Sequence, residues 1–295
     1  MYHYMYHFIL NPVAGKGKTL SAIEKIRKFL NERRVSYHVH YTQYPRHATE
    51  ITRELTIEGS KNIIAMGGDG TVNEVLNGFA DFESCNMGII PCGSGNDFAK
   101  FINLPFEPVK AMSLILEGSP KFTDYIQVNG GKRVMNVTGM GLDVAVLERC
   151  NRMKLFKGKL QYLISLIITL LKFKWYRFKL SFDGGEEQER TAMIVAVCNG
   201  KYFGGGMPIS PLSSIEDNYL NVIIVNKMKK SRIPMALLGM LRGKLLKYDF
   251  VENILCKRVW LKSLDEEDAV NMDGELIRSV DLDCLLMQNQ LKVFR

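Results

Sequence analysis

The chain has 295 residues, of which 46% are hydrophobic and 24% charged, and this balance excludes a disordered chain and allows one large or two ordinary domains. Lysine and arginine outnumber aspartate and glutamate by 39 to 31, which gives a formal charge of +8. The excess favours an anionic partner such as a nucleotide, a nucleic acid or an acidic membrane surface, without choosing among them. The six cysteines form no C-x-x-C pair, so a zinc site has little support.

The first part of the chain alternates apolar runs with helical patterns. The apolar runs predict strands at residues 7–10, 35–42, 62–66 and 87–90, and the helical spacing predicts helices at 19–31, 48–57 and 72–80. Alternation of this kind is typical of a parallel sheet with helices on its faces. We therefore predict an α/β domain over residues 1–123.

The pattern changes to strands from residue 124 onward. Asn129-Gly130 lies between two apolar runs and is a hairpin signal. Further strands are predicted at residues 178–182, 192–198, 220–225, 258–264 and 282–287. We predict a mainly antiparallel β-sandwich domain over residues 124–295, with two helical insertions and a last strand that could return to the first domain.

Three glycine-containing segments follow predicted strands of the α/β domain. They read NPVAGKGK at 11–18, GGDGTVNE at 67–74 and GSGNDFA at 93–99. Glycine lets the backbone approach a phosphate, and the helix that follows offers free N–H groups. The 67–74 segment by itself is equally compatible with an ordinary turn. Because the carboxyl ends of parallel strands lie at one edge of a sheet, we expect the three to converge on one phosphate site.

These segments together resemble the diacylglycerol kinase catalytic-domain family, in particular its bacterial lipid kinases, with sphingosine kinases as more distant relatives. The resemblance covers nearly the whole chain. It rests on Asn11-Pro12 with Gly15, Thr42 with His47-Ala48, 67–74, 93–99, Asp124, Asn199-Gly200, 203–207 and 273–275. It implies an α/β nucleotide domain, a C-terminal β-sandwich, and a nucleotide between them.

The resemblance also implies which residues meet ATP, the expected co-substrate. They are Asn11, Thr42, Gly67, Gly68, Asp69, Gly70, Thr71, Val72, Asn73 and Ser94. Ser94 replaces a threonine that is common in bacterial relatives, and both supply a hydroxyl. Asp69 and Asp124 are expected to belong to a catalytic Mg²⁺ network, which gives a carboxylate a reason to lie beside a phosphate.

Asp273 and Glu275 flank Gly274 near the end of the chain. Phosphorylation of an alcohol benefits from a base near the hydroxyl, and in an extended segment residues i and i+2 point to the same side. The resemblance implies that this motif holds the general base. We favour Asp273, with Glu275 as its neighbour or substitute. The alternative is a surface β-turn, because Asp-Gly is a common turn signal.

The segment 214–220 resembles a structural Mg²⁺ loop of the bacterial relatives. The resemblance implies a carboxylate ligand from Asp217 and backbone carbonyl ligands from Ser214 and Tyr219, which suit a hard cation. Asn218 takes the place of a residue that is usually acidic or glycine. Asparagine tolerates left-handed backbone angles, so the turn can survive.

Residues 154–172 have the pattern of an amphipathic helix. Its polar stripe consists of Lys154, Lys157, Gln161, Ser165, Thr169 and Lys172. The helix either lies in a membrane interface or packs in the C-terminal domain with its stripe facing water. The same two options apply to residues 233–246. The longest uncharged apolar run has twelve residues, too few to cross a bilayer.

These observations predict a lipid kinase that transfers the γ-phosphate of ATP to a lipid hydroxyl, with diacylglycerol as the expected acceptor and phosphatidic acid as the product. The expected partners are a lipid at the membrane surface and no nucleic acid, and a homodimer stays open. We see no signal peptide and expect a cytoplasmic protein, with peripheral contact at the inner membrane face open. The alternatives are a soluble kinase of the NAD kinase or phosphofructokinase type and a nucleotide-binding regulator without catalysis.

Overall fold

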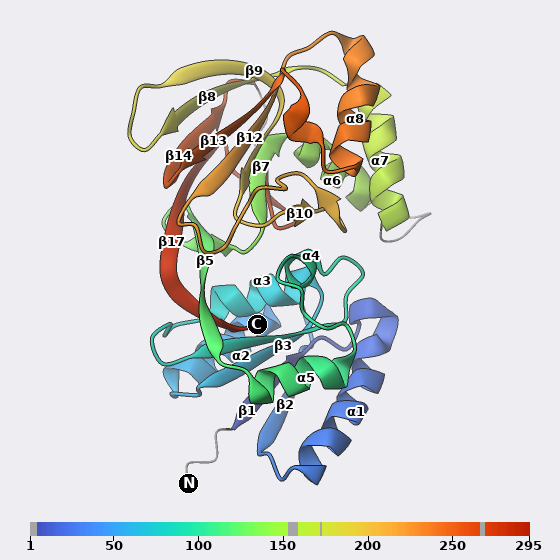
Figure 1. The fold of residues 1–295 in the computed structure, drawn as a ribbon, viewed down its shortest axis with the longest axis vertical. Coiled ribbons are helices and arrows are strands. Elements are labelled where there is room, and N and C mark those ends of the chain that lie inside the picture. The colour runs from blue at the N-terminus through green and yellow to red at the C-terminus, as the bar shows by residue number, and fades with distance from the viewer. Residues whose placement is uncertain (1–4, 153–158, 172, 266–268) are drawn as a thin grey trace. The chain divides into compact units, whose positions relative to one another are not determined.

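The computed structural model describes residues 5–152, 159–171, 173–265 and 269–295. Contacts within the chain divide it into two compact units. The first unit is Met1–Asp124 with Gln288–Arg295, and the second is Tyr125–Met287. Strands β5 (Pro120–Val128) and β17 (Asp281–Phe294) therefore each have residues in both units (Figure 1).

The other elements of the first unit are β1 (Tyr6–Leu10), η1 (Ala14–Gly17), α1 (Lys18–Glu32), β2 (Tyr37–Tyr41), α2 (His47–Ile57), β3 (Asn62–Gly67), α3 (Asp69–Gly78), β4 (Asn86–Pro91), α4 (Asp97–Phe101) and α5 (Pro108–Glu117). The other elements of the second unit are β6 (Lys132–Val134), β7 (Val137–Gly141), α6 (Leu142–Arg152), α7 (Lys159–Leu171), β8 (Tyr176–Phe182), β9 (Gln188–Cys198), β10 (Tyr202–Phe203), β11 (Met207–Pro208), β12 (Leu220–Asn226), η2 (Lys230–Arg232), α8 (Ile233–Leu241), η3 (Leu245–Lys247), β13 (Val251–Cys256), β14 (Arg258–Ser263), β15 (Ala269–Met272) and β16 (Glu275–Arg278).

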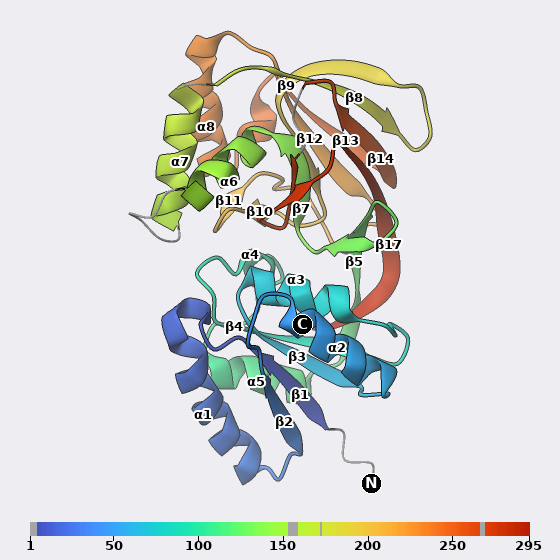
Figure 2. The ribbon, with the colours of Figure 1, turned by 180° about the vertical axis from the view of Figure 1, so that it is seen from behind.

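The first unit contains a parallel sheet in the order β2-β1-β3-β4, and the end of β17 pairs in parallel with β4. All six residues of β3 are buried, as expected for an inner strand covered on both faces. Helices α1 and α5 share one core with the sheet, and α2 packs against α3 (Figure 2). The α/β architecture predicted for this part of the chain is confirmed. The short helix α4 and helix α5 were not predicted.

The second unit is mainly antiparallel and is organised around β9. One side of β9 pairs with β12, and the other side pairs with β8 along its first half and with β7 along its second half. The sheet therefore divides into a branch through β7, β15 and β16 and a branch through β8, β14 and β17. Residues 192–198 of β9 are all buried, which explains their uninterrupted apolar sequence. The antiparallel fold predicted for this part is confirmed, with α6 as an unpredicted helix.

Helix α7 packs in the second unit, but its polar stripe does not face water. Ser165 and Thr169 are buried, and Thr169 Oγ1 accepts a hydrogen bond of 3.0 Å from Nε of Arg149 in α6. Ile167 and Leu171 are instead exposed. The expected orientation was wrong because Thr169 and Gln161 of the stripe bond to Arg149 and Cys150 of α6. Lys154, Lys157 and Lys172 lie outside the described residues. Within the described ranges, no helix is long and apolar enough to cross a bilayer.

Candidate active site

The ends of four parallel strands are held together at one edge of the first unit's sheet. The backbone nitrogen of Asn11 donates to Met66 (3.1 Å), that of Thr42 donates to Leu10 (2.9 Å), and that of Cys92 donates to Gly67 (2.8 Å). Each bond extends the hydrogen-bonding pattern of two paired strands one residue beyond their ends. The loops after β1, β2, β3 and β4 therefore start side by side, in the arrangement that forms ligand sites in α/β sheets.

The three glycine loops touch through their backbones. A Cβ added to Gly93 would lie 2.4 Å from the Cα of Gly68, and a Cβ added to Gly15 would lie 1.9 Å from the carbonyl oxygen of Cys92. These contacts leave no room for a side chain at Gly93 or Gly15. Gly93 and Gly15 are thus required by close backbone approach, which brings three strand-to-helix loops to one place.

Side chains reinforce the contact between the loops. Nδ2 of Asn11 donates to Oγ1 of Thr71 (3.3 Å) and links the loop after β1 to the first turn of α3. Oδ1 of Asp69 accepts from the backbone nitrogens of Asp97 (2.6 Å) and Phe98 (3.4 Å). Asp69 therefore holds the first turn of α4, a structural task that the sequence did not predict.

The other residues predicted to contact ATP differ in exposure and in the hydrogen bonds they already make. The side chain of Val72 is buried, and its backbone nitrogen donates to the carbonyl oxygen of Gly68 (3.1 Å). A Cβ on Gly70 would meet nothing within 4 Å, which leaves the N-terminus of α3 open. Ser94 is exposed, and Oδ1 of Asn73 accepts a bond of 3.1 Å from Asn77.

Asn96 is a residue of this site whose role the sequence did not predict. Its backbone is left-handed, with φ of 53°. Its side-chain amide both accepts from the nitrogen of Gly93 and donates to the oxygen of Gly93, each at 2.9 Å. Asn96 therefore clamps the loop after β4. The signal was a Gly-Asn pair before a helix, which marks a left-handed turn.

Asp124, the other residue assigned to the Mg²⁺ network, is buried in β5, and its Oδ1 accepts from the backbone nitrogen of Asn289 (3.3 Å). It thus joins β5 to the returning end of β17 in the first unit. The described residues contain no group of three or more His, Cys, Asp or Glu side chains placed to hold a metal. A Mg²⁺ ion shared by Asp69 and Asp124 stays a prediction.

The segment around Asp273 is not extended. Met272 pairs with Glu275 across a two-residue turn, in which Asp273 has φ of 49° and Gly274 has φ of 90°. The expected i, i+2 alignment of the two carboxylates was therefore wrong, because positive φ at both central residues reverses the chain. The turn reading, kept as the alternative, describes the backbone.

The carboxylate of Asp273 is occupied by backbone donors from a distant segment. Oδ2 accepts from the nitrogen of Met135 (2.6 Å), and Oδ1 accepts from those of Asn136 (2.9 Å) and Val137 (3.1 Å). Glu275 is exposed at the start of β16. Three backbone donors favour the ionised carboxylate over the protonated one, which argues against our preference for Asp273 as the base.

The loop predicted to bind structural Mg²⁺ precedes β12. Asn218 has φ of 62°, the left-handed conformation that the sequence suggested, and Oδ1 of Asp217 accepts from the nitrogen of Tyr219 (3.1 Å). Ser214 is partly exposed and Asp217 is exposed. One carboxylate and backbone carbonyls form a donor set that fits a hard cation, and the ion itself stays a prediction.

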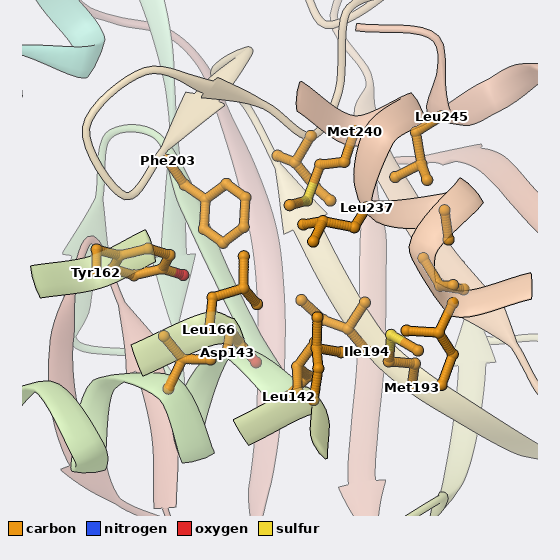
Figure 3. A pocket seen from close by; sticks show the side chains of 16 residues that line it. Leu142, Asp143, Tyr162, Leu166, Met193, Ile194, Phe203, Leu237, Met240 and Leu245 are labelled. Atoms are coloured by element: carbon orange, nitrogen blue, oxygen red, sulfur yellow. The ribbon is translucent and has the colours of Figure 1, made fainter. Parts of the chain in front are cut away.

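The second unit contains an apolar pocket with a volume of about 40 Å³ (Figure 3). Its lining comes from α6, α7, α8 and the strands beneath them, and includes Leu166, Ile194, Leu237 and Met240. Asp143, the second residue of α6, is among the lining residues. The sequence analysis did not single out Asp143. Its signal was a carboxylate placed in an otherwise apolar stretch after two glycines.

Asp143 is buried, with 2% of its surface exposed. Burial raises its pKa from an ordinary 3.8 to about 6, against the opposing effect of a hydrogen bond from Asn271. That bond joins Nδ2 of Asn271 to Oδ2 of Asp143 (3.0 Å), and Oδ1 of Asn271 accepts from the nitrogen of Gly274 (2.9 Å). A continuous chain of hydrogen bonds therefore runs from the pocket to the turn that precedes Glu275.

Two family models cover almost the whole chain. Residues 5–128 match the diacylglycerol kinase catalytic domain, and residues 136–295 match the YegS C-terminal NAD kinase beta sandwich-like domain. A probable lipid kinase YegS-like protein of Chromohalobacter salexigens is 31% identical over 76% of this chain and 73% of its own length. A diacylglycerol kinase of Bacillus subtilis is 27% identical over 90% of this chain and 88% of its own length.

Solved structures share the fold. A crystal structure of a diacylglycerol kinase from Bacillus anthracis aligns with 100% of this chain and 98% of its own, with a TM-score of 0.80 and 24% identity. An NAD kinase from Archaeoglobus fulgidus in complex with ATP aligns over 99% of this chain and 94% of its own with a TM-score of 0.54, at 11% identity. The two domain models and the 31% identical relative together assign the chain to the diacylglycerol kinase-like lipid kinase family.

Proposed function

We propose that this protein transfers the γ-phosphate of ATP to the hydroxyl of a lipid, and that diacylglycerol, which would give phosphatidic acid, is the first acceptor to test. The observation that carries the proposal is the meeting of three glycine loops, each leading into a helix, at one sheet edge. Relatives named diacylglycerol kinase supply the acceptor class. The reaction breaks the bond between the γ-phosphorus and the β–γ bridging oxygen and forms a bond from phosphorus to the lipid oxygen.

The nucleotide half of the proposal uses residues of the first unit. Backbone N–H groups at the open start of α3, next to Gly70, suit phosphate oxygens. The side chains of Asn11 and Thr71 are hydrogen-bonded to each other, so the loop after β1 and the start of α3 lie together. Mg²⁺ bound with the nucleotide would neutralise developing charge, and Asp69 and Asp124 are the carboxylates we assign to its network.

We assign the general base to Glu275 rather than Asp273. A base must take a proton from the lipid hydroxyl as the new bond to phosphorus forms. The carboxylate of Asp273 is held by three backbone donors, whereas Glu275 is exposed on the same turn. Asp273 then has a positioning role, because it ties the turn to residues 135–137.

The lipid half of the proposal uses α7 and α8. These helices lie side by side in both views and line the apolar pocket (Figures 1 and 2). They also expose apolar side chains, namely Ile167, Leu171, Met235, Leu238 and Leu241. Exposed lysines at 229, 230 and 244 lie near α8 in the sequence. Apolar and basic groups of this kind bind anionic bilayers, so we propose peripheral membrane contact through this surface.

The test is a transfer assay with γ-labelled ATP, Mg²⁺ and purified protein. One reaction contains diacylglycerol in mixed micelles, and a parallel reaction contains NAD without lipid. Label in phosphatidic acid supports the proposal. Label in NAD and in none of the lipids would instead assign the fold to a soluble nucleotide kinase.

A further inference from the structure

Three of the chain's five histidines lie together on one face of the first unit's sheet, and the proposed chemistry uses none of them. His7 belongs to β1, and His38 and His40 belong to β2. The register pairs His7 with His38 and Ile9 with His40, which puts the three rings on the face opposite Phe8 and its core. The ring centre of His7 is 6.5 Å from that of His38 and 5.5 Å from that of His40. Those of His38 and His40 are 4.5 Å apart.

A hydrogen bond joins two of the rings. Nδ1 of His7 lies 3.2 Å from Nε2 of His40, and Nε2 of His7 lies 3.3 Å from Oγ of Ser60. A bond between two imidazoles needs an N–H on one ring and a lone pair on the other, and a protonated imidazole has two N–H groups and no lone pair. The contact is therefore lost once both rings are protonated, because two donors would then face each other.

The surroundings of the cluster disfavour the charged rings. Burial, followed by repulsion from the rings of His38 and His7, lowers the pKa of His40 from an ordinary 6.5 to about 4. Burial and His38 also lower the pKa of His7, against the opposing effect of Glu58, the carboxylate just after α2. Because both pKa values are lower in the folded chain, the unfolded chain binds more protons between about pH 4 and 6.5. The stability that depends on these rings is therefore lost as the pH falls through that window.

The cluster lies on the strand pair that leads to two of the nucleotide loops. Strand β2 is the last strand at its edge of the sheet, and in the part of the chain that the structure describes it pairs with β1 alone (Figure 2). A strand held on one side opens more easily than an inner strand. Asn11 follows β1, and the backbone nitrogen of Thr42, just after β2, donates to Leu10 (2.9 Å). Opening of this pair would separate two loops that we assign to ATP.

We propose that His7, His38 and His40 form a proton-sensitive cluster. As the pH falls below neutral, the cluster weakens the pairing of β1 with β2, so the nucleotide-free unit opens at this edge and bound ATP holds it closed. Because protonation is reversible, a return to neutral pH restores the pairing. The role of ATP rests on the proposed function, whereas the opening of the strands does not.

Amide hydrogen exchange of the full chain, corrected for the intrinsic effect of pH, tests the strand pairing. Samples at about pH 7.5 and about pH 5.5 contain EDTA, because neutral imidazoles bind transition metals. We expect the open population of residues 37–42 to rise at least about threefold at the lower pH, which is the effect of His40 discounted for solvent screening. The inner strand β3 should rise less. Equal opening at both pH values would overturn the proposal.

His40→Gln removes the titrating ring and keeps hydrogen-bonding groups at this position. We expect the ratio of the two open populations to fall below about half of the wild-type ratio. A ratio measured within one protein does not change when stability is lost uniformly. His47→Gln, a histidine of the same unit outside the cluster, is the matched control and keeps the wild-type ratio. A wild-type ratio in His40→Gln, or an equal fall in His47→Gln, would show that the cluster is not the sensor.

The protonation of His40 is measured directly by NMR of protein labelled with ¹⁵N-histidine, where the signal missing from His40→Gln identifies the ring. We expect its titration midpoint to lie below the ordinary 6.5 and to move upward in His38→Gln, because one repelling ring is gone. A midpoint that does not move in His38→Gln would show that the rings titrate independently, which would reject the cluster.

The link to the nucleotide is tested by repeating the exchange at about pH 5.5 with ATP and no lipid. ATP well above its dissociation constant should lower the open population of residues 37–42 by at least about tenfold, since a ligand of the closed form disfavours opening. Calorimetry under the same conditions shows whether ATP binds. Bound ATP without protection would reject the link to the loops. No binding of ATP at either pH would contradict the proposed function, while the exchange ratios without ATP would still decide the proton-sensitive pairing.

Discussion

Oδ1 of Asp69 lies 2.6 Å from the backbone nitrogen of Asp97, so the loop after β3 holds the first turn of the helix after β4. Two neighbouring loops of the sheet edge are thereby fastened by a charge-assisted hydrogen bond. The acid of the GGDGT segment has this structural task in addition to any work on Mg²⁺. The effects of Asp69 substitutions on stability and on catalysis therefore have to be measured separately.

Asp69→Ala removes the acceptor for Asp97 and Phe98, and we expect it to lower the free energy of unfolding by about 1–3 kcal/mol. Asp69→Asn retains an oxygen acceptor and should lose less than half as much. If Asp69 also serves Mg²⁺, the Asn variant needs more Mg²⁺ for half-maximal activity. Denaturant unfolding and Mg²⁺ titration measure the two effects. Equal destabilisation by both variants would show that the hydrogen bond matters little.

Gly93→Ala places a Cβ 2.4 Å from the Cα of Gly68 and 2.8 Å from Oδ1 of Asn96. Because one neighbour is backbone, the two loops must separate, and we expect the affinity for ATP to fall by at least about tenfold. Gly131→Ala, in the turn between β5 and β6, meets nothing within 4 Å and serves as the control. Titration of both folded variants with ATP measures the affinities to be compared. Wild-type ATP affinity in Gly93→Ala would contradict the phosphate site.

Glu275→Gln and Asp273→Asn should differ in kind. We expect Glu275→Gln to lower kcat by about 10²–10⁴-fold with little change in stability, as for the loss of a general base. Asp273→Asn turns one acceptor oxygen into a donor that faces backbone N–H groups, so it should lose about 1–3 kcal/mol of stability. Glu186→Gln, an exposed acid of the same unit, is the control. Full activity in Glu275→Gln would return the base to Asp273.

Asp143 gives the stability of the protein a specific pH dependence. Its pKa is about 6 in the folded chain and lower when unfolded, so between about pH 4 and 6 the folded state binds more protons. Through this group the free energy of unfolding falls as pH rises across that window, and it levels off above it. The full decrease in the free energy of unfolding through Asp143 is about 3 kcal/mol.

We therefore expect Asp143→Asn to be more stable than wild type at neutral pH and to lack this slope. Urea unfolding at about pH 4.5 and about pH 7.5 measures the difference between the two proteins. A constant difference across the two pH values would show that Asp143 does not titrate in this range.

The chain's apolar periodicity and glycine positions were enough to predict the parallel sheet, its loops and the antiparallel second part. These features are local, because strand and helix periods and tight turns are set by neighbouring residues. The convergence of the glycine loops followed from the geometry of parallel strands. What the sequence did not show was the contact between backbones, such as Gly68 against Gly93.

Tertiary structure decided the roles of individual acids. The partners of Asp273 are Met135, Asn136 and Val137, more than 130 residues away in the chain, and no local pattern identifies them. The polar stripe of α7 faces inward because Arg149 supplies a partner for Thr169. Asp143 came to notice only because folding buries it in the lining of an apolar pocket. Local sequence specifies where a side chain can point, and the distant groups that meet it determine what it does.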